Sequence, residues 1–124
     1  MADVVYLITD MLFSSKLREA AKATGVTVQP VREPAAFAAA AQEAKLAIVD
    51  LRLPTALAAL EALGAAARQP GQLRQLRQLR IVGFIDHEKT DVMDAARAKG
   101  CTDVMAKGQF ANALPKLLAS ISAG

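Results

Sequence analysis

The sequence predicts an α/β domain built on a parallel five-stranded sheet. Short apolar runs rich in valine, isoleucine and leucine alternate five times with longer stretches of helical character, and this alternation is typical of β-α-β units with right-handed crossovers. Most of the runs lack polar alternation, which indicates strands buried on both faces. The 124 residues have the size of one domain, so we expect a single domain over residues 1–124.

Five segments have the composition of strands. They cover residues 4–8, 26–30, 46–50, 80–85 and 102–106. The second segment ends at Pro30, and because proline cannot donate a ladder hydrogen bond, we expect this strand at an edge of the sheet.

Five segments between and after the strands predict helices. They cover approximately residues 14–24, 35–44, 56–67, 91–99 and 109–122. The expected N-caps are Ser14 or Ser15, Thr55 and Thr90. Gly25 and Gly100 follow two of the helices, where glycine favours a helix end. Pro115 falls within the last helix, so we expect it in the first turns or at a bend.

The composition narrows the class of protein. The formal charge is only +3, aromatic residues make up 4% of the chain, and there is no tryptophan, which disfavours a nucleic-acid surface built on stacked bases. With Cys101 as its single cysteine, the chain has no internal disulfide, which fits a reducing compartment. Cys101 stands at the start of the fifth strand, where we expect it to be a small buried apolar residue. No apolar run is long enough to span a membrane and no signal peptide is evident, so we expect a cytoplasmic protein.

Polar residues stand where the predicted strands end. They are Thr9 and Asp10 after the first strand, Asp50 at the end of the third, Asp86 after the fourth and Lys107 after the fifth. The carboxyl ends of parallel strands lie at one edge of a sheet, where sites of such folds form. Two carboxylates and an ammonium can therefore converge there. The structural alternative is that Asp10 and Asp50 only cap helices and that Lys107 neutralises them.

With these residues the chain resembles the receiver domains of response regulators, the family of the chemotaxis response regulator, over its full length. Asp50, followed by Pro54, falls on the phosphoacceptor aspartate, Lys107 on the lysine after strand five, and Asp10 on the second acid of the acidic pair. Gly100 before strand five also fits. The resemblance implies a flavodoxin-like, doubly wound sheet in the order 2-1-3-4-5 with five helices, phosphoryl transfer from a histidine kinase, and Mg²⁺ held by the acidic cluster.

The chemistry of these residues agrees with the roles that the resemblance implies. A carboxylate can attack phosphorus, Mg²⁺ needs few protein carboxylates, and a lysine offsets developing phosphoryl charge. Asp10 and Asp50 are the expected ligands if Mg²⁺ binds.

Four positions depart from the family pattern. Thr9 replaces the first acid of the pair, and Gly108 stands where a proline is expected after the lysine. Ile85 replaces the Thr or Ser after strand four, so it cannot donate the charge-assisted hydrogen bond to a phosphoryl oxygen, a bond of about 1.5–3 kcal/mol. Val104 replaces the switch aromatic of strand five. The two degenerate switch positions, Ile85 and Val104, indicate that the readout of phosphorylation is lost.

Our main hypothesis is therefore a pseudo-receiver that signals through protein contacts and is not an enzyme. The sequence has no glycine-rich phosphate loop, which argues against a nucleotide enzyme on this fold. The alternative is a competent Mg²⁺-dependent aspartyl phosphoacceptor of a phosphorelay. The expected partners are a signalling kinase or a downstream effector, and the resemblance suggests a homodimer through the fourth helix, the fifth strand and the fifth helix.

A threefold Gln-Leu-Arg repeat occupies residues 72–80. The simpler interpretation is a surface helix whose leucines fold onto the domain. The alternative is a docking arm in which Arg74, Arg77 and Arg80 contact a protein partner, or less favourably a nucleic acid, because no aromatic residues interleave the arginines.

Overall fold

A computed structural model of the chain describes residues 2–67 and 79–122. Its strands are β1 (Val4–Leu7), β2 (Val28–Pro30), β3 (Leu46–Asp50), β4 (Arg80–Ile85) and β5 (Asp103–Ala106). Its helices are α1 (Met11–Thr24), α2 (Pro34–Ala41), α3 (Ala56–Ala67), α5 (Thr90–Ala98) and α6 (Lys107–Ser122). Within these residues no helix combines the length and the apolar character needed to cross a membrane.

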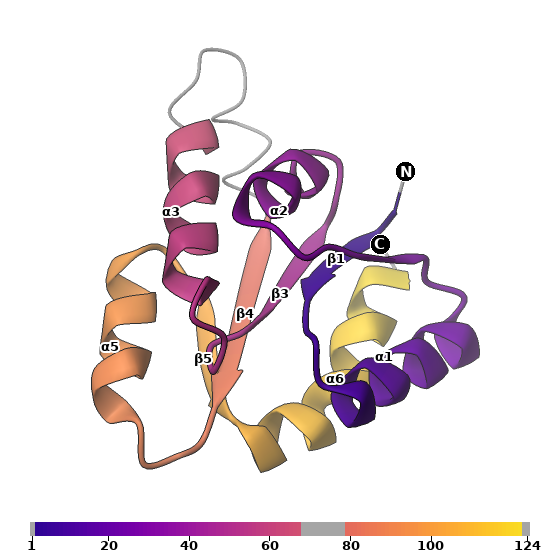
Figure 1. The fold of residues 1–124 in the computed structure, drawn as a ribbon. Helices are drawn as coiled ribbons and strands as arrows, with labels where there is room; N and C mark the ends of the chain where they lie inside the picture. Colours follow the sequence, from indigo (N-terminus) through magenta and orange to yellow (C-terminus); the bar gives the residue numbers. More distant parts are fainter. Residues whose placement is uncertain (1, 68–78, 123–124) are drawn as a thin grey trace.

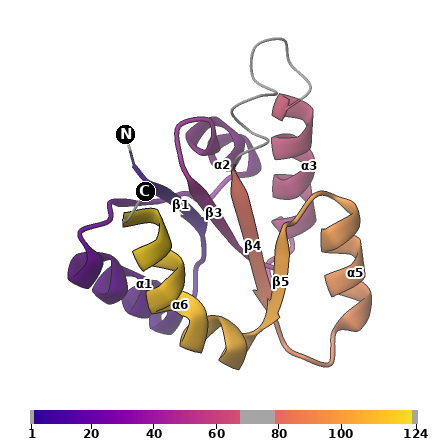
Figure 2. The same cartoon turned by 180° about the vertical axis from the view of Figure 1, so that it is seen from behind.

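The strands of the described residues form one parallel sheet in the order β2-β1-β3-β4-β5. The predicted fold class and strand order are therefore confirmed. β2 lies at an edge, as Pro30 predicts, and it is shorter than expected because pairing with β1 begins at Val28. The parallel strands place their carboxyl ends at one edge of the sheet (Figure 2).

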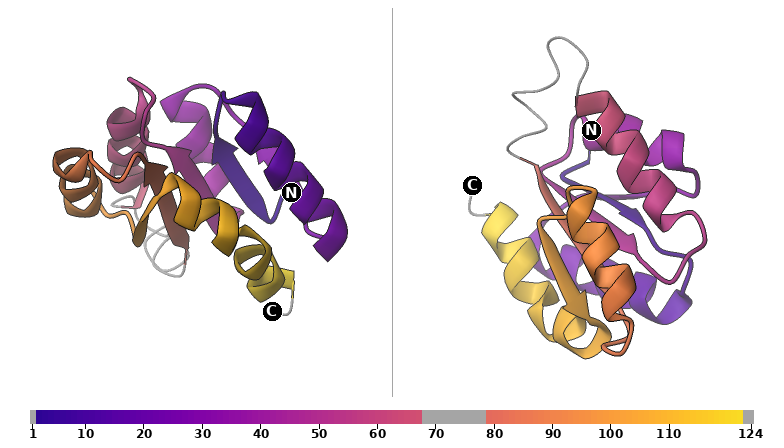
Figure 3. Two further views of the ribbon diagram at one scale, coloured as in Figure 1. Left: turned by 90° about the horizontal axis from the view of Figure 1, so that it is seen from below. Right: turned by 90° about the vertical axis from the view of Figure 1, so that its left-hand side faces the viewer.

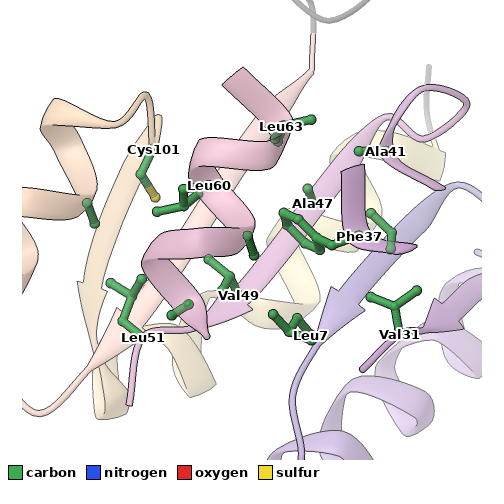
Figure 4. Close-up of a cluster of buried hydrophobic side chains, with 14 of the residues drawn as sticks. Leu7, Val31, Phe37, Ala41, Ala47, Val49, Leu51, Leu60, Leu63 and Cys101 are labelled. Carbon is green, nitrogen blue, oxygen red and sulfur yellow. The ribbon is translucent and has the colours of Figure 1, made fainter. Parts of the chain in front are cut away.

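Helices cover both faces of this sheet (Figures 1 and 3). On one face α1 and α6 lie side by side over Tyr6, Ile48 and Phe84. On the other face α2, α3 and α5 enclose a second apolar cluster (Figure 4), whose labelled members include Leu7, Phe37, Val49, Leu60 and Cys101. β1 and β3 are buried throughout, which explains their uninterrupted apolar sequences. The prediction that Cys101 is buried is also confirmed.

The N-terminus of α1 differs from the prediction. Its N-cap is Asp10, whose carboxylate accepts hydrogen bonds from the backbone N–H groups of Leu12 and Phe13. Residues 11–13 are therefore helical, and neither Ser14 nor Ser15 is the cap. The hydroxyl of Ser14 donates instead to the carbonyl of Ile8 at 3.3 Å. A carboxylate is preferred here because it also complements the positive end of the helix dipole.

Other helix ends differ by a few residues. α5 begins at Thr90 itself, and its N-cap residue Lys89 makes no side-chain cap hydrogen bond. α6 begins at Lys107, directly after β5, and includes Pro115 in its interior. The predicted helix ends before Gly25 and before Gly100 are confirmed, since both glycines adopt positive φ angles, 72° and 102°, that suit residues without a Cβ.

Most of the Gln-Leu-Arg repeat, including Arg74 and Arg77, lies outside the described residues. Its last residues are described: Leu79 is buried and Arg80 begins β4. The Arg80 guanidinium forms a 2.8 Å ion pair with Asp103.

Candidate functional site

The polar residues predicted at the strand ends lie at the same edge of the sheet. Asp50 is the last residue of β3, Ile85 the last of β4, and Lys107 the first residue after β5. Thr9 and Asp10 follow β1, which pairs with β3. Thr9 is exposed, whereas Asp10 is half-buried.

Asp50 is a buried carboxylate whose two oxygens both accept hydrogen bonds. Its side chain is only 2% exposed. Oδ1 accepts from the backbone N–H of Arg52 at 3.0 Å and from the Arg52 Nε at 2.9 Å. Oδ2 accepts from the Arg52 Nη2 at 2.8 Å. The chain turns after β3 so that Arg52 folds back onto the carboxylate two residues before it, as an Asx turn allows.

The same guanidinium reaches Asp10. Arg52 Nη2 lies 3.3 Å from Asp10 Oδ2, and the two backbone N–H groups of α1 occupy Oδ1 at 2.8 and 3.1 Å. The hydrogen bond from the Phe13 N–H, followed by those from Leu12 and Arg52, holds the pKa of Asp10 below its usual value. We call this arrangement of Asp10, Asp50 and Arg52 the arginine bridge.

Aromatic rings flank the arginine bridge. The guanidinium carbon of Arg52 lies 5.5 Å from the ring centre of Phe13 and 5.7 Å from that of Phe84. Cation–π contacts of this length stabilise a charged guanidinium. The hydrogen bonds to Asp50, together with the charges of both carboxylates, raise the pKa of Arg52 well above its usual value. Arg52 is therefore a fixed positive charge beside Asp10 and Asp50.

Lys107 makes a different contact from the one predicted. Its Nζ lies 2.8 Å from Asp86 Oδ1, and it lowers the pKa of that carboxyl. Asp86 Oδ1 is buried and receives no hydrogen bond of good geometry from the described residues, so this contact is an ion pair by distance. Lys107 therefore does not neutralise Asp10 and Asp50 as the structural alternative supposed, and the Arg52 guanidinium lies against those two carboxylates instead. Lys107 is the first residue of α6, directly after β5. From there its ammonium contacts Asp86, which follows β4.

The two degenerate switch positions lie in one apolar cluster. Ile85 is 4% exposed and belongs to the core beneath α3 and α5 together with Leu51 and Ala96. Val104 packs against the same cluster from β5. Both side chains are on the face of the sheet that α5 covers. The end of β4 therefore presents hydrocarbon.

Sequence reasoning missed Arg52, Phe13 and Phe84 as members of the site. An arginine two residues after an acid that ends a strand is the one available signal, since a turn at this spacing can return the guanidinium to the carboxylate. The contribution of Phe13 depends on the entry angle of α1, which no local pattern specifies.

The donor set fits a divalent cation poorly in this arrangement. Among the described residues no group of three or more His, Cys, Asp or Glu side chains is placed to hold a metal ion. The two acids that could serve, Asp10 and Asp50, already share the guanidinium of Arg52.

The sequence matches no protein-family model and no curated protein, whereas solved structures with the same fold are numerous. One is the receiver domain of a sensor histidine kinase from Pseudomonas aeruginosa PAO1, crystallised with a magnesium ion coordinated in its active-site cleft. It is 14% identical to this chain, covers 99% of it and 98% of its own length, and superposes with a TM-score of 0.72.

Two response regulators are similarly close. The chemotaxis response regulator CheY4 of Vibrio cholerae is 18% identical, with 98% of each chain covered and a TM-score of 0.70. A response regulator from Hahella chejuensis is 20% identical, with 98% of this chain and 95% of its own covered and a TM-score of 0.73. The chain thus has the fold of response-regulator receiver domains, and the resemblance found in the sequence is confirmed at the level of the fold.

Proposed function

We propose that this chain is a receiver-like signalling domain of the two-component type, which acts through protein contacts and is not switched by phosphorylation in the usual way. The fold and the position of Asp50 at the end of β3 support the first part. The observation that carries the second part is the buried Ile85 at the end of β4.

Ile85 removes the hydrogen bond by which a phosphoryl group would be sensed. Its side chain has no donor, and its burial in the apolar cluster with Leu51 and Ala96 fixes it by packing. A move of Ile85 toward the pocket would expose apolar surface and leave a cavity, both of which cost free energy. Val104, in the same cluster, is too small to act as an aromatic rotamer switch. Neither side chain can therefore link Asp50 to the α5 side of the sheet through a hydrogen bond.

The partners follow from this proposal. A domain without its own phosphorylation switch signals by being present, by binding, or by a change imposed by another protein. A kinase or an effector is the expected class of partner. The homodimer through α5, β5 and α6 stays a prediction, which size-exclusion chromatography with light scattering will test.

A competent phosphoacceptor is the second candidate, favoured by the closeness of Asp10 and Asp50, which bind one nitrogen of Arg52. The test of both is incubation of the protein with Mg²⁺ and either acetyl phosphate or beryllofluoride. The proposal expects no change in amide NMR shifts across α5 and β5, with or without modification of Asp50. Asp50→Asn is the matched control.

Stoichiometric modification of Asp50 accompanied by shifts across α5 and β5, or by a change in oligomeric state, would contradict the proposal and establish the second candidate. Modification with shifts confined to the loops around Asp10 and Asp50 would agree with a reactive aspartate that has no readout.

A further inference from the structure

We infer that Arg52 takes the place of a metal ion at the acidic pair Asp10 and Asp50. Its guanidinium lies between the two carboxylates, where a divalent metal ion would bind, so the guanidinium and a metal ion exclude each other. This inference goes beyond the proposed function, which rests on the end of β4.

The carboxylate oxygens of Asp50 and Asp10 already accept hydrogen bonds. Asp50 Oδ1 and Oδ2 both accept from Arg52, at 2.9 and 2.8 Å from Nε and Nη2. Asp10 Oδ2 accepts from Nη2 at 3.3 Å. Asp10 Oδ1 caps α1. A metal ion needs these lone pairs at shorter range, and it gains them only if the guanidinium leaves.

Arg52 also supplies the positive charge that Asp50 needs. The buried carboxylate of Asp50 requires a positive partner, because an unpaired buried charge is strongly unfavourable. Arg52 supplies that partner from within the chain and leaves the three groups with a combined charge of −1. A divalent ion brought beside a guanidinium would meet strong electrostatic repulsion.

The residues around Arg52 suit a guanidinium in particular. Phe13, Phe84 and Phe110 form a connected aromatic group, with Phe84 and Phe110 stacked at a centroid distance of 4.3 Å and an angle of 9°. The planar cation lies beside the first two rings. A guanidinium can contact aromatic rings while it donates two parallel hydrogen bonds, which neither lysine nor a hydrated metal ion can do.

Arg52 therefore controls access to the Asp50 carboxylate. The same bonds that neutralise Asp50 also engage both of the oxygens with which it could attack phosphorus. Metal binding and reaction at Asp50 therefore both require Arg52 to swing out of the pocket. Only the Asp10 side of the bridge, where Arg52 and Asp10 are 28% and 33% exposed, opens to solvent.

The test is a titration of the full chain with Mn²⁺, in which electron paramagnetic resonance measures the free aqueous ion. We expect the wild-type protein to leave the Mn²⁺ signal unchanged. We expect Arg52→Met to bind one Mn²⁺ per chain, at least about tenfold more tightly than wild type. Asp50→Asn combined with Arg52→Met should abolish that binding.

Two controls separate charge from packing. Arg52→Lys keeps a cation in the pocket and should stay metal-free. Arg80→Met removes another arginine that is paired with an aspartate, at 2.8 Å from Asp103, and should behave as wild type. Circular dichroism shows whether each variant folds.

The inference is overturned if the wild-type protein binds one Mn²⁺ per chain as tightly as Arg52→Met, or if folded Arg52→Met binds none. If Arg52→Met does not fold, the shorter neutral donor in Arg52→Gln replaces it, and stoichiometric binding by wild type still overturns the inference. No phosphoryl donor is present, so this result and the outcome for the proposed function are independent.

Discussion

Two ion pairs with the same 2.8 Å separation stand at one edge of the sheet, in different surroundings. In the arginine bridge the Asp50 and Arg52 side chains are 2% and 28% exposed. In the pair at the ends of β4 and β5 the Asp86 and Lys107 side chains are 41% and 42% exposed. Equal distances therefore do not mean equal contributions to stability. The buried pair should contribute more, because water screens the second pair and cannot replace a lost partner in the first.

The largest expected effect is on the buried pair. Arg52→Met should lower the free energy of unfolding by about 3–5 kcal/mol, because the Asp50 carboxylate is left buried without a counter-charge. Urea denaturation in the presence of a chelator measures this loss.

A double variant sharpens the interpretation of that loss. Asp50→Asn combined with Arg52→Met removes both charges and should recover much of the stability, since an amide still accepts from the backbone N–H of residue 52. A double variant as unstable as Arg52→Met would show that Arg52 acts through packing on Phe13 and Phe84.

The next effect concerns the hydrocarbon at the end of β4. Ile85→Thr places a hydroxyl in the apolar cluster and should cost about 1–3 kcal/mol beyond the loss of a methyl group. Ile85→Val is the matched control, with an expected cost of about 0.5–1.5 kcal/mol. Equal stabilities of the two variants would mean that the hydroxyl finds a partner and that the site tolerates a polar switch residue.

The exposed pair should contribute less. Lys107→Met should lower stability far less than Arg52→Met does, and added salt should reduce the difference further. Lys107 lowers the pKa of Asp86 in the folded state, so its contribution is present above the usual aspartate pKa and is lost as pH falls through the lowered value. NMR titration of Asp86 in Lys107→Met should show its pKa closer to the ordinary one.

A further effect, seen only at alkaline pH, lies away from both pairs, at Cys101. Burial raises the pKa of this thiol to about 11 from 9.0, and the side chain is 6% exposed. The folded state favours the protonated thiol, so its contribution is full below pH 9 and is lost as pH rises toward 11. Cys101→Ala should lack this loss, and a thiol reagent at neutral pH should modify the native protein far more slowly than the denatured one.

Much of the fold was predictable because local patterns specify it. The apolar runs ending at Asp50 and Ile85 gave strands with the observed ends, and Gly25 and Gly100 ended helices as expected. The start of α1 was not predictable from the serines. Asp10, Ser14 and Ser15 are all possible caps, and only the structure shows that the Asp10 carboxylate accepts from the first backbone N–H groups of the helix.

For the candidate site, the sequence predicted which residues lie at the strand ends but not which of them form ion pairs. Asp10, Asp50 and Lys107 were placed at one edge because parallel strands end together. Lys107 pairs with Asp86, and Arg52 pairs with the two other acids. These pairs depend on how the turns after the strands direct each side chain, which local patterns do not specify.

The sequence by itself determined the order of strands and helices and the residues at the edge of the sheet, because hydrophobic periodicity and helix-ending residues are local signals. Only the tertiary structure decided which cation neutralises Asp50. The physical reason is that ion pairing depends on separation and burial in three dimensions, and these arise when α1 brings Phe13 and Asp10 against the turn that follows β3.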